Sequence, residues 1–156
     1  MDKKQIEQYI DTYSQIMQSI SISMQTIQKD SFKNSIITPD QFNLMNIINT
    51  SDTCTSSFLA KVLNVKKSTI TAIVNRLSDK GLVTRISKEN DRRVIMLKLT
   101  EQGQFILEKE RKNLFNKLMP LGNTITEDEF ENLRKNITLI DLQLKTIIKG
   151  VNKDEN

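Results

Sequence analysis

Two long stretches of the chain, residues 3–29 and 126–150, carry apolar side chains at steps of three and four residues. This spacing places the side chains on one face of an amphipathic α-helix. In the second stretch the steps alternate over three heptads, and such a seam requires a partner helix along its length. A small domain cannot cover two such seams, so we expect a homodimer; packing of the two stretches within one chain is the alternative. The side chains expected at the dimer contact are Ile6, Ile10, Ile137, Ile140, Leu144 and Ile147.

Shorter elements are predicted between these two stretches. Thr38-Pro39-Asp40-Gln41 is a capping box with proline at the first helical position, Asn64-Val65 suits a tight turn, and Gly81 can end a helix in the left-handed conformation. The expected elements are helices over residues 39–49, 56–63, 67–80 and 100–119 and strands over residues 82–86 and 94–99. The sequence therefore predicts one domain over residues 1–156, mainly α with a small β wing. Its parts are a winged helix-turn-helix head at 38–99, a connecting helix at 100–119 and the two dimerisation helices.

The sequence lacks the residue types and motifs that catalysis, metal binding or cofactor binding usually require. It contains no histidine, one cysteine, no glycine-rich phosphate loop and no paired carboxylates on a shared face, so no enzyme, metal site or cofactor is expected. No apolar run is long enough to cross a membrane, and Met1 is followed by Asp-Lys-Lys and a patterned helix, which predicts a cytoplasmic protein. Cys54 directly precedes the expected helix cap Thr55, which favours a small buried thiol over an oxidant sensor.

Positive charge is concentrated in one segment of the chain. Residues 61–98 hold ten lysines and arginines against three acidic residues, a net charge of +7; the whole chain is +4, so the remainder is −3. Such a block on an otherwise slightly acidic chain is typical of a protein that binds a polyanion. On charge alone, a basic face that is merely solvated is the alternative.

The helix expected at residues 67–80 has an apolar face and a polar face. Its apolar residues, Ile70, Ile73, Val74 and Leu77, share the side that must face the core. The opposite side carries hydroxyl, amide and guanidinium groups and a small alanine, which can read base edges and a thymine methyl in the major groove. These residues are Ser68, Thr71, Ala72, Asn75 and Arg76, with Asp79 beside them. Lys66 and Lys67 stand at the helix start, where ammonium groups and free backbone N–H groups can bind phosphate together.

The polar loop Lys88-Glu89-Asn90-Asp91-Arg92-Arg93 joins the two expected strands. Two adjacent arginines at a hairpin tip can enter a narrow minor groove, where the negative potential is deepest. Asp91 is expected to hold one neighbouring arginine by a charge-assisted hydrogen bond, so that its guanidinium is aimed before DNA arrives. The wing residues expected at the DNA are therefore Lys88, Asp91, Arg92 and Arg93.

Four segments resemble the MarR (multiple antibiotic resistance regulator) family: Ser68-Thr69-Ile70-Thr71, Arg76 to Val83, Asp91-Arg92-Arg93, and Leu99-Thr100-Glu101-Gln102-Gly103. The flanking helices also fit the layout of that family. The resemblance implies a triangular helical dimer with two winged heads, a recognition helix in each major groove and a wing arginine in the minor groove. It further implies a bacterial transcription regulator, commonly a repressor that releases DNA when a small molecule binds.

Position by position, the resemblance implies DNA contacts from Ser68, Thr69, Thr71, Asn75 and Arg76 and a wing pair of Asp91 and Arg93. Three positions depart from the family. Lys66 stands where a capping serine or threonine is frequent, which weakens the cap and can add a phosphate contact. Ala72 stands where a larger polar residue is frequent, and Asn64 replaces the usual turn glycine but tolerates the left-handed conformation.

Two further expectations concern partners. A winged helix that binds another protein or RNA through the same basic face is the main alternative function. An organic effector is expected in the crevice between each head and the dimer helices, although the same side chains could simply form core. The residues expected to line this crevice are Tyr13, Met17, Ile20, Met24 and Phe42.

Overall fold

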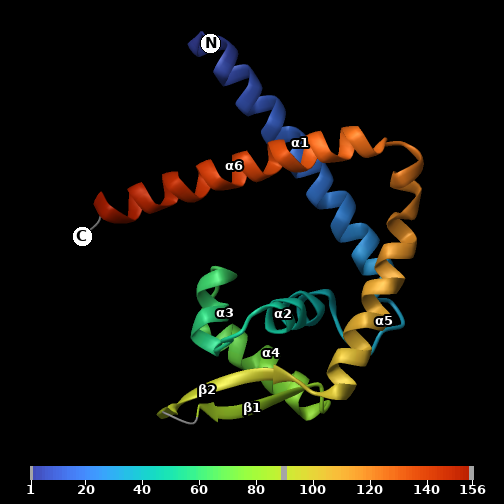
Figure 1. Cartoon of the computed structure of the whole chain (residues 1–156), viewed down its shortest axis with the longest axis vertical. Coiled ribbons are helices and arrows are strands. Elements are labelled where there is room, and N and C mark those ends of the chain that lie inside the picture. The colour runs from blue at the N-terminus through green and yellow to red at the C-terminus, as the bar shows by residue number, and fades with distance from the viewer. Residues whose placement is uncertain (1, 89–90, 155–156) are drawn as a thin grey trace. The chain divides into compact units, whose positions relative to one another are not determined.

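The computed structural model describes the backbone of residues 2–88 and 91–154 and the side chains of residues 2–87 and 94–148. The chain divides into two compact units, Met1–Lys117 and Leu118–Asn156. The elements are α1 (Lys3–Ser31), α2 (Pro39–Thr50), α3 (Ser56–Val62), α4 (Lys67–Asp79), β1 (Val83–Lys88), β2 (Asp91–Leu99), α5 (Glu101–Leu118), η1 (Met119–Asn123) and α6 (Glu127–Asp154). This mainly helical fold with one two-stranded antiparallel sheet confirms the predicted fold class (Figure 1).

The core of the first unit lies where α2, α3 and α4 meet the sheet and the first half of α5 (Figure 1). Fully buried side chains come from all of these parts: Leu44, Met45, Leu59, Ile70, Leu77, Leu82, Leu97 and Leu107. Each side chain of this size contributes roughly 1.5–3 kcal/mol by leaving water. From α4, Ile70, Val74 and Leu77 are buried and Ile73 is half-buried against the same cluster, so the predicted apolar face is confirmed.

The predicted helix ends and turns are also confirmed. Thr38 and Gln41 form a reciprocal capping box at the start of α2, with Pro39 at the first helical position. Asn64 has a φ of 51° in the turn between α3 and α4, and Gly81 has a φ of 70° after α4. Both residues therefore occupy the left-handed region that asparagine and glycine tolerate best.

The start of α5 is fastened to the end of α4 through Thr100. Its N–H donates to the carbonyl oxygen of Leu82 over 3.1 Å, and its hydroxyl donates to that of Gly81 over 2.6 Å. The same hydroxyl oxygen accepts the N–H of Gly103 over 3.0 Å. A Cβ at position 103 would overlap the carbonyl oxygen of Leu82 and lie 3.0 Å from its carbonyl carbon. Glycine is thus required where α5 crosses this backbone.

The two strands extend further into polar sequence than expected. β1 and β2 pair from Val83↔Leu99 to Ser87↔Ile95, with a register irregularity between Ser87 and Lys88. Backbone pairing does not need apolar side chains, so alternation of hydrophobicity gave no signal for the polar residues at these strand ends. Of the predicted apolar positions of this short helix, Leu59 is buried, whereas Phe58, Val62 and Leu63 are exposed.

The long helices near the two ends of the chain carry exposed apolar side chains. No residue of Lys3–Ser31 is buried in the single chain. In the second unit, α6 begins at a capping box in which Thr126 and Glu129 hydrogen-bond each other's backbone N–H groups. Hydrogen bonds from the N–H and hydroxyl of Thr126 also lower the pKa of the Glu129 carboxyl. Among the described residues, no helix has an apolar stretch long enough to cross a membrane.

Candidate nucleic-acid interface

The residues on the outer face of α4 are exposed because the opposite face of the helix is buried in the core. Because Ile70, Val74 and Leu77 anchor the helix in the core, the residues between them must point outward. The structure leaves exposed the predicted recognition residues that follow the two lysines: Ser68, Thr69, Thr71, Ala72, Asn75 and Arg76. The result is a surface of hydroxyl and amide groups, a methyl group and a single guanidinium.

The start of α4 is open. Lys66 occupies the N-cap position without a side-chain hydrogen bond to the helix, as its substitution for a capping serine or threonine predicted. The first N–H groups of a helix have no acceptor within it and carry its positive partial charge. Lys66 and Lys67 are both exposed beside these groups. The arrangement offers an anion two ammonium groups and unpaired backbone donors.

A hollow of about 420 Å³ lies next to this helix start. It is lined by Thr55, Ser56 and Ser57 at the start of α3, by Lys67 and Thr71 of α4, by Arg85 of β1, and by Val94 and Ile95 of β2. Hydroxyl groups around two cations suit a phosphate oxygen. The surface suited to an anion therefore extends from the start of α4 to the neighbouring residues of α3 and β1.

Two hydrogen bonds fix side chains on the outer face. Thr71 donates its hydroxyl proton to the carbonyl oxygen of Lys67 over 2.9 Å. Arg85 donates from a terminal guanidinium nitrogen to Oδ1 of Asn75 over 2.5 Å. Sequence reasoning counted Arg85 in the basic segment but did not assign it to the interface. The pattern gave no sign of its contact with α4, which depends on how β1 returns beside that helix.

The wing is present as a hairpin. The strands β1 and β2 form it, and Lys88 pairs with Asp91. The side chains predicted to contact DNA from the wing, Lys88, Asp91, Arg92 and Arg93, lie outside the described residues. Their role in the minor groove therefore stays a prediction.

The predicted dimer residues lie in two different units of the chain. Ile6 and Ile10 in α1 are 39% and 58% exposed, and Ile137, Leu144 and Ile147 in α6 are also exposed. Ile140 is half-buried. Apolar stripes of this length on helices are available for a partner helix.

The residues predicted to line an effector crevice differ in environment. Phe42 is buried and packs on Phe32, with ring centroids 5.0 Å apart. Tyr13, Met17 and Ile20 are exposed on α1, and Met24 is half-buried. The role of these five side chains in binding a ligand stays a prediction.

Cys54 is buried, as expected from its place before the α3 cap. It is 1% exposed, and its carbonyl oxygen accepts the N–H of Leu97 over 2.8 Å. Burial raises the pKa of the thiol from 9.0 to about 11, so it remains protonated at neutral pH. Within the described part of the chain, histidine, cysteine and carboxylate side chains form no group of three that could hold a metal ion.

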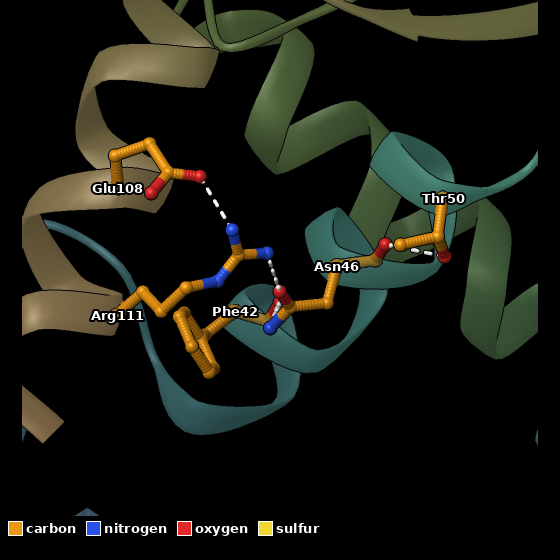
Figure 2. A network of polar contacts seen from close by, with 5 residues as sticks. All are labelled: Phe42, Asn46, Thr50, Glu108 and Arg111. Atoms are coloured by element: carbon orange, nitrogen blue, oxygen red, sulfur yellow. Dashed lines mark hydrogen bonds and ion pairs between the residues drawn. The ribbon is translucent and has the colours of Figure 1, made fainter. Parts of the chain in front are cut away.

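A polar network joins the helix-turn-helix to α5. Figure 2 shows the guanidinium of Arg111 in α5 between Asn46 of α2 and Glu108. Arg111 donates to Oδ1 of Asn46 over 2.7 Å and to Glu108 over 2.5 Å. Asn46 in turn donates from Nδ2 to the carbonyl oxygen of Phe42 over 3.2 Å. These bonds hold the middle of α5 on α2.

The model of the MarR family matches residues 37–95 of the chain. Over 148 residues the chain is 27% identical to the uncharacterized HTH-type transcriptional regulator YdgG of Bacillus subtilis (strain 168), covering 93% of this chain and 96% of that protein. It is 30% identical over 113 residues to the uncharacterized HTH-type transcriptional regulator YdgJ of the same organism, covering 67% of this chain and 68% of that protein. A mutant of MarR from E. coli, solved in complex with operator DNA, matches with a TM-score of 0.69 and 26% identity, covering 85% of this chain and 95% of that one.

Proposed function

Since the chain belongs to the MarR family, we propose that it is a transcription regulator that binds specific sequences of duplex DNA. The observation that carries this proposal is the outer face of α4, where Ser68, Thr71 and Asn75 are exposed opposite the buried stripe. Short polar side chains without charge are suited to distinguishing base edges in the major groove. The structure of E. coli MarR with operator DNA supports the same use of the fold.

Phosphate contacts come from the basic groups around this face. Lys66 and Lys67 flank the open start of α4, and Lys67 also lines the adjoining hollow together with Thr55, Ser56 and Ser57 at the start of α3. Contacts of this kind set the position of a protein on the duplex but carry little sequence information. We assign affinity mainly to these groups and base selection mainly to α4.

The proposed regulator acts as a homodimer through the apolar stripes of α1 and α6. Two copies related by a two-fold axis present two α4 helices, so the operator is expected to be an imperfect palindrome. Its half-sites are expected roughly 10 base pairs apart, centre to centre, which is one turn of the duplex. A regulator of this type acts in the bacterial cytoplasm, and no catalytic activity is assigned to it.

Salt dependence tests DNA binding against the alternative of a protein or RNA partner. The affinity for a selected operator should fall steeply with salt, with a logarithmic slope of about 0.9 per neutralised phosphate. Lys67→Met should lower that slope by about one per head. Lys145→Met, in α6 outside the basic segment, is the matched control and should leave it unchanged. Equal binding to duplex RNA of the same sequence, or a slope near zero, would contradict the proposal.

We further propose repression that an organic ligand relieves. The ligand would occupy the crevice lined by Tyr13, Met17, Ile20, Met24 and Phe42, and would release DNA by favouring a spacing of the two heads that fits the operator poorly. Such a ligand must bind the two spacings with different affinity, because equal affinity shifts nothing. By linkage, DNA should weaken the ligand as much as the ligand weakens DNA.

A thermal-shift screen of aromatic acids and amphipathic compounds tests this mechanism, with operator binding measured for each hit. Tyr13→Ala should abolish the response to a hit, whereas Tyr9→Ala, one turn away on α1 and 63% exposed, should retain it. Hits that stabilise the protein but leave DNA affinity unchanged would refute release by ligand.

A further inference from the structure

We propose that Arg85 is a positioning residue for Asn75 and that the two side chains together select guanine at one position of each operator half-site. The inference rests on the proposed function, because it states what one part of the DNA-binding face reads. It assigns a role in specificity to a residue of the strand β1, not of the recognition helix.

The geometry joins a side chain of the outer face to one of the sheet. Asn75 is exposed on α4, one helical turn after Thr71. Arg85 reaches it from β1, which contacts α4 (Figure 1), and the two side chains share a hydrogen bond of 2.5 Å. Because the guanidinium can only donate, it is the oxygen of the Asn75 carboxamide that faces Arg85. The Nδ2 group is therefore directed away from Arg85.

This orientation changes which base the asparagine can read. A free carboxamide presents a donor and an acceptor side by side, which matches the N7 acceptor and the N6 amine of adenine. Here the acceptor is engaged by a cation, and the guanidinium places further N–H donors beside it. Adenine would bring its own amine toward this positive group. Guanine instead offers two acceptors, O6 and N7, to the same edge of the major groove.

Arg85 also lines the hollow that contains Lys67 and Thr71. A phosphate contact in this hollow is the competing role for Arg85, and the two roles make different predictions. A phosphate contact contributes to affinity on every sequence, whereas positioning Asn75 changes the preference at one base pair. Lys67 serves as the matched control, because it carries the same charge in the same hollow and makes no side-chain hydrogen bond to Asn75 among those of the described residues.

The experiment selects binding sites from a random duplex library with four full-length proteins: the wild type, Arg85→Met, Arg85→Lys and Lys67→Met. The affinity of each protein is then measured for the selected site and for its guanine-to-adenine variant. The wild type should prefer guanine over adenine at one half-site position by roughly 5- to 150-fold, the discrimination typical of one good base contact. Arg85→Met should shift that position toward adenine and leave the others unchanged. Lys67→Met should weaken binding to all sequences and keep the guanine.

Two further variants make the result decisive. Arg85→Lys keeps the charge but loses the planar fork that holds the carboxamide, so it should lose the guanine preference while retaining more affinity than Arg85→Met. Asn75→Ala should remove the preference at the same position, and adding Arg85→Met should change it no further. Unchanged guanine preference in both Arg85 variants would overturn the inference while leaving DNA binding intact. A wild type that enriches no sequence at all would refute the proposed function and this inference together.

Discussion

Replacement of Gly103 by alanine should destabilise the protein through a single steric conflict. The added Cβ would overlap the carbonyl oxygen of Leu82 and lie 3.0 Å from its carbonyl carbon. Carbon atoms prefer separations of roughly 3.5–4.0 Å, so α5 and the backbone at Leu82 must move apart. Overpacking of this kind costs about 1–3 kcal/mol.

The same movement stretches the hydrogen bonds that fasten α5. Thr100 donates to Leu82 and accepts from Gly103 at this point, and the loss of one such bond costs about 1 kcal/mol. Alanine regains about 1 kcal/mol through its higher helix propensity. The expected net loss in the free energy of unfolding is therefore about 1–3 kcal/mol, which lowers the melting temperature by roughly 2–12 °C for a chain of this size.

Circular dichroism melting at a fixed protein concentration measures this loss, because the stability of a dimer depends on concentration. Gly122→Ala is the matched control, since a Cβ at position 122 meets no atom within 4 Å. It should leave the melting temperature nearly unchanged. If Gly103→Ala and Gly122→Ala had the same melting temperature, the steric argument from the close approach of α5 to Leu82 would be refuted.

Three further predictions address the dimer, the wing and the cysteine. Ile140→Glu combined with Leu144→Glu should yield monomers in sedimentation, because buried unpaired carboxylates cost several kcal/mol; an unchanged dimer would exclude α6 from the interface. Arg92→Ala and Arg93→Ala should weaken binding to operator and random DNA alike, whereas Asn75→Ala should change the preference at one or two base pairs; identical effects would contradict this division of labour. Because burial raises the pKa of Cys54 from 9.0 to about 11, the unfolded chain ionises first, and stability should fall between about pH 9 and 11. Cys54→Ala should lack this loss of stability between about pH 9 and 11. A loss of DNA binding in peroxide that disappears in Cys54→Ser would show that the thiol is reactive and would overturn the prediction.

The sequence predicted those parts of the fold that depend on periodicity and local chemistry. Ile70, Val74 and Leu77 recur at helical spacing, so the buried face of α4 and its outer face followed from one count. Asn64 and Gly81 marked the turns because few other residues tolerate a positive φ. Each of these signals is contained in a short segment of chain.

The parts that sequence did not predict depend on contacts between distant segments. Arg85 reaches Asn75 because β1 returns beside α4, and no spacing in the sequence expresses that return. Gly103 was visible as part of a motif, but the need for glycine there comes from the nearby carbonyl group of Leu82, 21 positions earlier. The full length of the strands was missed because hydrogen bonds between backbones leave no trace in polar residues at a hairpin end.

The fastening of α5 has a mechanical consequence. The helix is held near its start by Thr100, in its middle by the bond from Arg111 to Asn46, and near its end by the ion pair of Lys117 with Asp30 of α1. Its 18 residues span about 27 Å at 1.5 Å per residue. A rod of that length turns a tilt of about 5° at one end into a displacement of roughly 2 Å at the other. Base-edge hydrogen bonds tolerate only a few tenths of an ångström, so a small rotation of α1 would be enough to lift α4 out of register with the duplex.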